Sequence, residues 1–246
     1  MDEFLRDPTS LSNDEIEEIE RQSLRALFVA ACNLGFDAYE IFRQSTDSPK
    51  DIGEDTTREM MDRLGGYQLQ QRILGNVDYR KAHYVILPEL ALRQALFVDS
   101  KAEKDDDTSG TLQMSQLSLR VRFFKSGVAT DEPGHLNPIS VHGAKSYLTT
   151  TLLVHYNYKE VERGQDEYEF VLEKTTLVAV PNGKLQEHYN PDATDTIWRA
   201  GRDAPTRGED FRVRISFPRL KLKRSWRVQE IMFAPALKSF VAEWED

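Results

Sequence analysis

The sequence predicts an α/β fold in which a mixed β-sheet and several helices form one domain over residues 1–246, with an acidic helical N-terminal part over residues 1–64. Apolar residues recur at helical spacing in the first quarter of the chain, and β-rich runs dominate the rest. No repeat, low-complexity tract or linker divides the chain. With 246 residues, 39% of them hydrophobic, the chain is long enough to bury a sizeable core.

Two helices are predicted in the N-terminal part. Ser12 and Glu15 form a capping box ahead of apolar residues at three-to-four spacing, which predicts a helix over residues 13–33. A second helix is predicted over residues 52–64, because a Gly-Gly pair follows it where a C-terminal cap belongs.

The rest of the chain is predicted to form strands, loops and one more helix. Leu112, Leu117 and Val121 have helical spacing, which predicts a helix over residues 111–124. Residues 126–145 are rich in Gly and Pro and are predicted to form a long loop. Strands are predicted over residues 72–80, 93–102, 147–158, 168–180, 211–217 and 226–233, with the two from 147 to 180 at the centre of the sheet.

The composition excludes several classes of protein. A single cysteine, Cys32, excludes an intrachain disulfide and a multi-cysteine zinc site. The longest apolar run, residues 26–32, is far shorter than the roughly 20 residues that a bilayer requires, and the first residues are acidic, so we expect a cytoplasmic protein without a membrane segment. The sequence has no phosphate-binding loop and no dinucleotide motif, so we expect no nucleotide cofactor.

The charge is distributed unevenly along the chain. The net charge is −9, and residues 1–60 carry all of it, with fifteen acidic and six basic residues. Residues 199–227 hold ten basic residues against three acidic ones. A basic segment in an acidic chain indicates nucleic-acid binding as readily as it indicates an ordinary solvated face.

An acidic residue and a lysine lie side by side in a strand that the sequence predicts to be buried. Successive strand side chains alternate between faces, so Asp99 and Lys101 point to the same side. Three apolar residues precede them, and burying such charges requires a partner or a metal. Asp78 lies near the end of the preceding predicted strand, and adjacent strands would bring the two carboxylates together.

Two carboxylates and a lysine suit the hydrolysis of phosphodiesters. Carboxylate oxygens bind Mg²⁺ while leaving room for waters and a phosphate, and a lysine can orient or help to deprotonate the attacking water. The alternative is a structural ion pair between Asp99 and Lys101 near the end of a strand.

The strand predicted over residues 211–217 alternates apolar and basic residues. Arg212 and Arg214 are expected to lie on one face of it, with the apolar side chains on the other. Arginine is the preferred bidentate partner of guanine in the major groove, and the flanking Arg199, Arg202, Arg207 and Lys223 could contact phosphates, which position the protein without specifying sequence. The alternative is an edge strand whose charges prevent aggregation.

Short segments of the chain resemble, in the same order, motifs of the SfiI-type restriction endonucleases, which are relatives of BglI in the PD-(D/E)XK nuclease superfamily. The resemblance extends over about residues 14–233, although Val77 stands where the superfamily motif has proline. The segments include Glu54-Asp55-x-Thr57, Val77-Asp78-Tyr79, Val98-Asp99-x-Lys101-Ala102, Tyr189-Asn190-Pro191-Asp192, Pro205-x-Arg207-Gly208-Glu209, Arg212-Val213-Arg214 and Trp226-Arg227-x-Gln229-Glu230.

The resemblance implies a restriction-endonuclease-like core, a mixed sheet flanked by helices. It implies that Asp78, Asp99 and the backbone carbonyl of Ser100 ligate Mg²⁺, that Lys101 serves the attacking water, and that the products carry 5′-phosphates. For Glu54, on the preceding helix, it implies a supporting position beside the metal ligands.

The resemblance also implies how the protein meets DNA. Arg212 and Arg214 match the base-reading strand of these enzymes, which act as homodimers or homotetramers on double-stranded DNA at G/C-rich, interrupted palindromes. Two alternatives remain: a structure-specific repair or junction nuclease of the same fold, and a non-catalytic DNA-binding protein.

Overall fold

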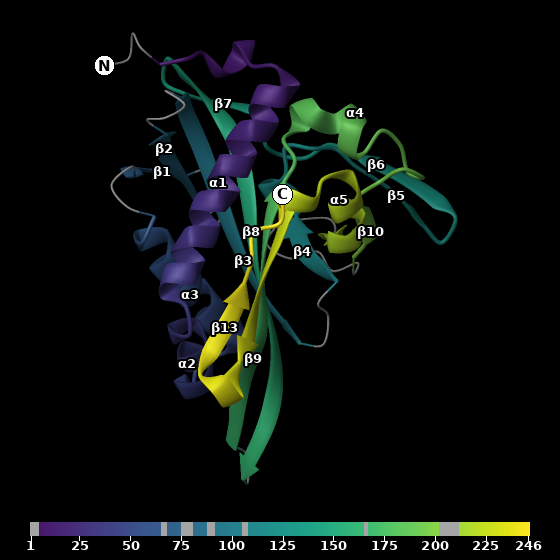
Figure 1. Ribbon diagram of the computed structural model, residues 1–246. Coiled ribbons are helices and arrows are strands. Elements are labelled where there is room, and N and C mark those ends of the chain that lie inside the picture. Colours follow the sequence, from purple (N-terminus) through teal and green to yellow (C-terminus); the bar gives the residue numbers. More distant parts are fainter. Residues whose placement is uncertain are drawn as a thin grey trace.

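An eight-stranded sheet forms the centre of the computed structural model (Figure 1), which describes residues 5–64, 68–74, 81–87, 92–104, 108–164, 167–201 and 212–246. Seven strands follow the order β1-β2-β3-β8-β9-β12-β13, and β7 pairs with β8. Their bounds are β1 Gln68–Leu74, β2 Lys81–Leu87, β3 Leu92–Lys104, β7 Ile139–His142, β8 Lys145–Gly164, β9 Glu167–Val180, β12 Val228–Ala234 and β13 Ser239–Ala242.

The sheet is mixed, as the sequence predicts. β3 and β8 pair in parallel, with Asp99 opposite Leu153 and Lys101 opposite His155, and the other pairs of this sheet are antiparallel. The prediction that the two runs between residues 147 and 180 lie centrally is confirmed, since they form most of β8 and β9. Every residue of β8 from Tyr147 to Tyr158 is buried, because side chains from neighbouring elements cover both faces of this strand.

Three helices cover one face of the sheet (Figure 1): α1 Asn13–Leu34, α2 Asp37–Gln44 and α3 Pro49–Asp62. Leu152, Val154 and Tyr156 of β8 form a core with the buried side of these helices. The capping box predicted at Ser12 and Glu15 is present, and it satisfies backbone donors at the start of α1. The helices predicted over residues 13–33 and 52–64 are confirmed, the second beginning earlier, at Pro49.

Smaller elements cover the other face. β4 Ser109–Gln113, β10 Trp198–Ala200 and β11 Arg212–Ser216 form a sheet in the order β10-β11-β4, β5 Val121–Lys125 pairs with β6 Val128–Glu132, and the short helices are α4 Gln186–Tyr189 and α5 Phe217–Lys223. Leu153 of β8 packs into a second core with Leu112 and Val213 of this layer. The main sheet therefore separates a helical layer from a layer built around β11.

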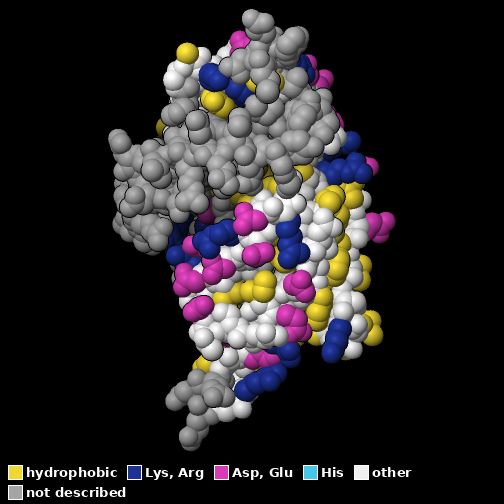
Figure 2. All heavy atoms as spheres, turned by 90° about the vertical axis from the view of Figure 1, so that its left-hand side faces the viewer, with side chains coloured by type: hydrophobic (Ala, Val, Ile, Leu, Met, Phe, Trp, Pro, Cys, Tyr) yellow, Lys and Arg dark blue, Asp and Glu magenta, His cyan; other side chains and the backbone are white. Residues whose placement is uncertain are grey.

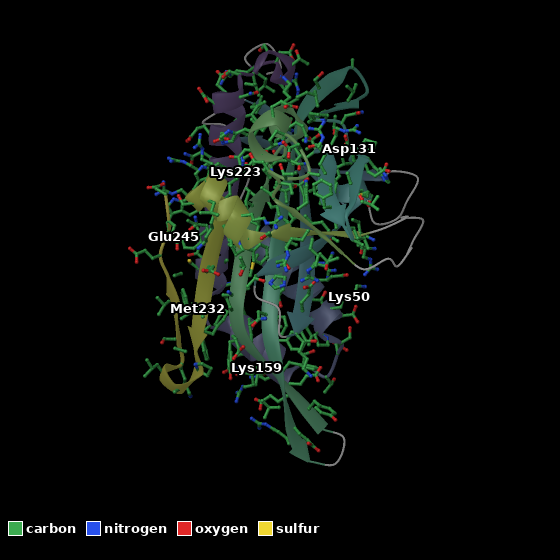
Figure 3. The ribbon with its side chains drawn as sticks, turned by 90° about the vertical axis from the view of Figure 1, so that its right-hand side faces the viewer. Lys50, Asp131, Lys159, Lys223, Met232 and Glu245 are labelled. Atoms are coloured by element: carbon green, nitrogen blue, oxygen red, sulfur yellow. The ribbon has the colours of Figure 1, made fainter. Side chains whose placement is uncertain are left out.

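Figure 3 shows the same arrangement from the side. Lys50 of α3 and Met232 of β12 lie at opposite sides of the view with the central strands between them, and Asp131 marks the β5–β6 hairpin. Lys159 lies where β8 and β9 extend away from the rest of the fold.

The helix predicted over residues 111–124 is wrong. The segment forms β4, a 3₁₀ turn over Met114–Gln116 and β5. Leu117, Leu119, Val121 and Phe123 are all buried at every second position, which is strand spacing. The 3₁₀ turn interrupts the alternation between the two strands. As a result, Leu112, Leu117 and Val121 have the spacing expected of a helix although no single element contains them.

The long loop predicted over residues 126–145 is also wrong, because it contains β6 and β7. β6 has no buried residue, so it lacks the alternation by which a half-buried strand is recognised. Other elements that were not expected from the sequence are α2, α4, α5, β2, β10 and β13.

The other strand predictions are confirmed with shifted bounds. β3 contains the strand predicted over residues 93–102, β11 ends at Ser216 because Phe217 begins α5, and β12 follows a 3₁₀ turn at residues 225–227. In the strand predicted over residues 72–80, residues 72–74 belong to β1 and the others lie outside the described residues, as do Gly65 and Gly66. No helix among the described residues is long and apolar enough to cross a membrane.

The acidic N-terminal part carries many of its charges in local ion pairs. Along α3, Glu54 lies 3.4 Å from Lys50 and Asp55 lies 2.6 Å from Arg58, each pair within one turn of the helix. Figure 2 shows the side of the molecule on which α2 and α3 lie, with acidic and basic side chains interspersed over the described part of that face.

Candidate active site and nucleic-acid interface

The sequence-predicted pair lies on the side of β3 that faces the β11 layer. Val98 and Ala102 pack into the helical core, so the alternate residues Asp99 and Lys101 point to the opposite side. Lys101 is in register with His155 of β8, which packs edge-to-face on Phe217 at the start of α5, with 5.4 Å between ring centroids. The candidate catalytic pair and the Arg-bearing strand β11 therefore share one side of the main sheet.

Asp99 and Lys101 are brought together as predicted. The Lys101 ammonium contacts Asp99 Oδ2 and also donates to the backbone carbonyl oxygen of Ser100 over 3.2 Å. The Asp99 and Lys101 side chains are 16% and 25% exposed, so both reach solvent from a partly buried position. A partly buried charge pair open to solvent is suited to meeting a substrate that carries charge.

The donor set at this place suits a divalent cation. Asp99 Oδ2 and the Ser100 carbonyl oxygen already converge on one cationic group, the Lys101 ammonium. Both are hard oxygen donors of the kind that Mg²⁺ prefers. Two such donors leave most of an octahedral shell for other ligands, and the described residues include no group of three His, Cys, Asp or Glu side chains placed to hold a metal.

Asp78, the third predicted member of the site, lies outside the described residues. The described strand that follows it begins at Lys81, and Ala82 pairs with Phe97, two residues before Asp99. The chain three residues after Asp78 thus runs beside the part of β3 that leads to Asp99.

Glu54 lies on α3, in the layer on the other side of β3. Its neighbour Gly53 approaches Tyr156 and Ala102, which fixes α3 against the sheet at the level of the candidate site. The Glu54 side chain is half exposed and pairs with Lys50. Its predicted support of the metal ligands stays a prediction.

The small sheet presents a polar, basic face. Val213 and Ile215 of β11 are buried, whereas Arg212 and Arg214 point to the other face, as the alternation predicts. Across β11, Arg214 pairs with the exposed Arg199 of β10 on one side and with Thr111 of β4 on the other. Like charges opposite one another are unfavourable, and here the Glu103 carboxylate, which pairs with Arg214, offsets part of the repulsion between Arg199 and Arg214.

The guanidinium of Arg214 is held by surrounding oxygens. Nε donates to Ser109 Oγ over 2.8 Å, Nη1 donates to Thr111 Oγ1 over 3.0 Å, and Nη2 donates to the Ser109 carbonyl oxygen over 2.9 Å and to the carboxylate of Glu103. Arg214 is therefore oriented before any ligand binds, a detail that its sequence position does not reveal.

In the C-terminal part of the basic segment, over residues 221–227, the basic side chains form ion pairs with acidic residues of the same chain. The basic side chains that pair with acidic ones are Lys221 with Glu230 and Glu245, Lys223 with Asp195, Arg224 with Glu17, and Arg227 with Glu20. These pairs neutralise the charge that the sequence suggested for phosphate contact, including that of Lys223. Arg202 and Arg207 lie outside the described residues.

Sequence reasoning assigned no role to two residues of this region, Glu103 and His155. Glu103 follows Lys101 on the same face of β3, and its carboxylate pairs with Arg214. His155 is fully buried, and its Nε2 lies 3.6 Å from Glu103 Oε2. Burial opposes ionisation of Glu103, but its contacts with His155 and Thr111 and its electrostatic interaction with Arg214 lower its pKa to about 2. The signal available in the sequence was the continued alternation from residue 99 to residue 103.

Comparisons with known proteins agree with one another. A family model described as type II restriction enzyme SfiI matches residues 20–231. The type II restriction enzyme SfiI of Streptomyces fimbriatus is 31% identical over 254 residues, which cover 98% of this chain and 93% of that enzyme.

Two solved structures also match. The tetrameric restriction endonuclease SfiI bound to cognate DNA superposes with a TM-score of 0.84 and 29% identity, over 98% of this chain and 93% of that one. The restriction endonuclease BglI bound to its DNA recognition sequence superposes with a TM-score of 0.70 over 88% of this chain and 90% of that one. At 15% identity, the match to BglI supports the fold alone.

Proposed function

The chain belongs to the SfiI family of type II restriction enzymes and is a site-specific deoxyribonuclease, and from this premise we propose that it cuts double-stranded DNA by Mg²⁺-dependent hydrolysis that leaves 5′-phosphate ends. The observation that carries the proposal is the shared orientation of two strands: β3 directs Asp99 and Lys101 to the side of the sheet on which β11 carries Arg212 and Arg214. One bound duplex can then be read and cut from the same side of the protein.

Asp99, the Ser100 carbonyl and Asp78 are proposed to hold the metal. Asp99 and Ser100 already direct oxygens at one cationic group, and Asp78 is close in sequence to the start of β2, which runs beside β3. When bound, Mg²⁺ stabilises negative charge on the phosphate and lowers the pKa of a bound water.

Lys101 is proposed to orient the attacking water. Asp99 and the Ser100 carbonyl hold its ammonium at the exposed side of the pair. The water oxygen bonds to phosphorus as the bond from phosphorus to the 3′ oxygen breaks. The water gives up a proton and the leaving 3′ oxygen gains one, which yields a 5′-phosphate and a 3′-hydroxyl.

Base reading is proposed for Arg212 and Arg214, because arginine is the side chain that most often recognises guanine, which suits a G/C-rich, interrupted palindrome. Arg202 and Arg207 are proposed to contact phosphates, together with Arg199, which is exposed on the same basic face. A palindrome requires two-fold symmetry, so we propose a homodimer at each site.

Residues 1–246 are proposed to act as one domain, because the helices of the acidic N-terminal part and the β11 layer pack on opposite faces of one sheet. Since the substrate is DNA, the cytoplasm is the proposed place of action.

Digestion of a fully sequenced DNA tests the proposal. The purified protein is incubated with phage DNA and Mg²⁺, with EDTA and an Asp99→Ala variant as controls, and the fragment ends are sequenced. Discrete ends that share a short palindrome and carry 5′-phosphates are expected only with active protein and Mg²⁺.

Other outcomes would contradict specific parts of the proposal. Nicks at mismatches or flaps would indicate a structure-specific nuclease. DNA that is bound but left intact would indicate a non-catalytic binding protein. Equal cutting in EDTA would overturn the assigned metal dependence.

A further inference from the structure

A carboxylate on β3 holds an arginine on β11. Glu103 accepts from Arg214 Nη2. The same guanidinium donates to Ser109 of β4 through Nε and Nη2, and to Thr111 of β4 through Nη1. β3 belongs to the main sheet, whereas β4 and β11 belong to the small sheet. This ion pair therefore ties the two sheets together at the residue proposed to read a base.

Glu103 stands in the same row of side chains as the candidate catalytic pair. Because side chains alternate along a strand, Asp99, Lys101 and Glu103, at every second position, lie on one face of β3. β3 and β8 pair in register from Gln94 to Lys104, so residues 99 to 103 are part of a continuous ladder. Glu103 therefore belongs to the same continuous backbone ladder as Asp99 and Lys101.

The residues around Glu103 fix the position of its carboxylate. Its side chain is 17% exposed, and His155 lies beneath it with both ring nitrogens buried. Hydrogen bonds between ionised groups are shorter and stronger than neutral ones. Glu103, Ser109 and Thr111 together accept four hydrogen bonds from the guanidinium of Arg214, and these contacts fix the plane of that guanidinium.

We propose that Glu103 is a positioning residue that sets the orientation of Arg214 for base reading and makes the cleavage step depend on that reading. The inference rests on the proposed base-reading role of Arg214. A guanidinium held by Glu103 and Thr111 meets a correctly placed guanine without losing further side-chain freedom, and it cannot turn to accommodate a different base. Because Glu103 stands two residues after Lys101, a base that displaces Arg214 acts on a residue of the same strand that carries the candidate catalytic pair.

A Glu103→Gln variant tests this, because glutamine keeps the shape and removes the charge. Single-turnover cleavage is measured on the cognate duplex and on duplexes with one recognition base pair changed, and binding is measured by gel shift in Ca²⁺. The ratio of cognate to altered-site cleavage is expected to fall about tenfold or more, the range of one good base contact. Cognate Kd is expected to change by less than about threefold, since Glu103 is not proposed to touch DNA.

Glu160→Gln is the matched control. Glu160 of β8 also pairs with a residue of β3, Lys104, over 2.8 Å, but it is exposed. The same substitution there removes an ion pair to the same strand and is expected to leave the discrimination ratio unchanged.

A double variant separates positioning from general damage. If Glu103 acts through Arg214, Glu103→Gln should cost no further discrimination in an Arg214→Ala background. Full additivity of the two changes would overturn the inference. An unchanged ratio in Glu103→Gln alongside a reduced ratio in Arg214→Ala would also overturn it, while leaving base reading in place. An unchanged ratio in Arg214→Ala would instead overturn the base-reading role itself.

A second pair of variants keeps the inference testable if Glu103→Gln does not fold. Thr111→Val removes the acceptor for Arg214 Nη1, and Thr111→Ser retains it. The valine variant is expected to lose discrimination and the serine variant to keep it. Equal ratios in both would contradict the inference.

Discussion

At the scale of single residues, substitution of Lys101 is expected to impair DNA cleavage without impairing DNA binding. Its ammonium is held by Asp99 and the Ser100 carbonyl, next to the proposed metal position and on the same side of the sheet as the Arg face of β11. A Lys101→Ala change is expected to slow cleavage by about 10²–10⁴-fold, the range of a positioned proton-transfer group. Binding in Ca²⁺ is expected to persist, because the base-reading strand is unaltered.

Cleavage time courses and gel shifts on the same duplex measure both effects. Lys104→Ala, which removes an exposed lysine three residues further along β3, is the control and is expected to cut at the normal rate. Normal cutting by Lys101→Ala would mean that this lysine serves only a structural ion pair.

The ionisation of Glu103 predicts an acid-dependent loss of stability. Its pKa in the folded protein is lowered from 4.5 to about 2, so ionisation stabilises the fold above the unfolded pKa and that stabilisation is lost as the pH falls toward 2. The wild-type protein is therefore expected to have a higher Tm than Glu103→Gln. This difference should be largest at pH 6 and should shrink progressively between about pH 4.5 and pH 2.

Thermal unfolding across this pH range measures the difference, and comparing two variants cancels the titration of other carboxyl groups. A Tm difference that stays constant from pH 6 to pH 2.5 would contradict the assigned pKa.

The sequence predicted Asp99 and Lys101 because alternation within one strand is a local property. The contact between Glu103 and Arg214 was out of its reach, since it joins residues 111 positions apart and depends on how two sheets pack. The same applies to Lys223 and Arg227, which lie in the basic segment of the sequence but whose partners, Asp195 and Glu20, come from distant segments.

At the scale of elements, a buried ion pair joins α1 to the turn before β12. Glu20 and Arg227 are both fully buried, with Glu20 Oε2 2.7 Å from Arg227 Nη2. Glu20 also accepts from the Asn182 backbone over 2.8 Å, and Arg227 donates to Tyr189 over 2.6 Å. Without Glu20, Arg227 keeps only the more distant carboxylate of Glu17, at 3.7 Å, to offset its buried charge.

A Glu20→Ala change is expected to destabilise the fold by about 3–5 kcal/mol. Urea unfolding at a fixed protein concentration measures the loss. Glu18→Ala, on the exposed side of the same helix, should fall within about 0.5 kcal/mol of the wild-type protein. Equal stability of the two variants would show that the Glu20 pair contributes nothing net.

Elements with local signals were predictable and elements defined by their partners were not. The capping box at Ser12 marks the start of α1 without reference to the rest of the chain. β6 and β13 have few buried positions, and they exist as strands because β5 and β12 pair with them. For the segment from β4 to β5, a 3₁₀ turn shifted the register, so the apolar spacing imitated a helix.

At the scale of the whole molecule, the sequence predicted a mixed sheet but not the order of its strands. The parallel pair β3–β8 is separated in the chain by β4, β5, β6 and β7. Most of those intervening elements lie on the β11 side, so the crossover that makes the sheet mixed also builds the layer that holds Arg214. Topology of this kind follows from packing between layers, which no local pattern reports.

The last prediction concerns assembly. The SfiI structure that this chain matches over 98% of its length is a tetramer bound to DNA. If this chain assembles in the same way, two-fold symmetry at each palindrome leaves a tetramer with two DNA-binding clefts. Light scattering is expected to give four times the chain mass. Once one site of a plasmid is bound, a second site on the same DNA is present at high effective concentration, so a two-site plasmid should be cut faster than a one-site plasmid.

Adding a short duplex that carries the site distinguishes assembly from simple site counting. If the tetramer must fill both clefts, moderate amounts of the duplex should speed cutting of the one-site plasmid by occupying the second cleft in trans. A large excess should slow it by competition. A particle of two chains whose cutting rate per site is the same on both plasmids, and is only inhibited by added duplex, would show that the dimer alone acts. The bridging outcome would make cleavage depend on two recognition events, each read through the β11 face of a separate dimer.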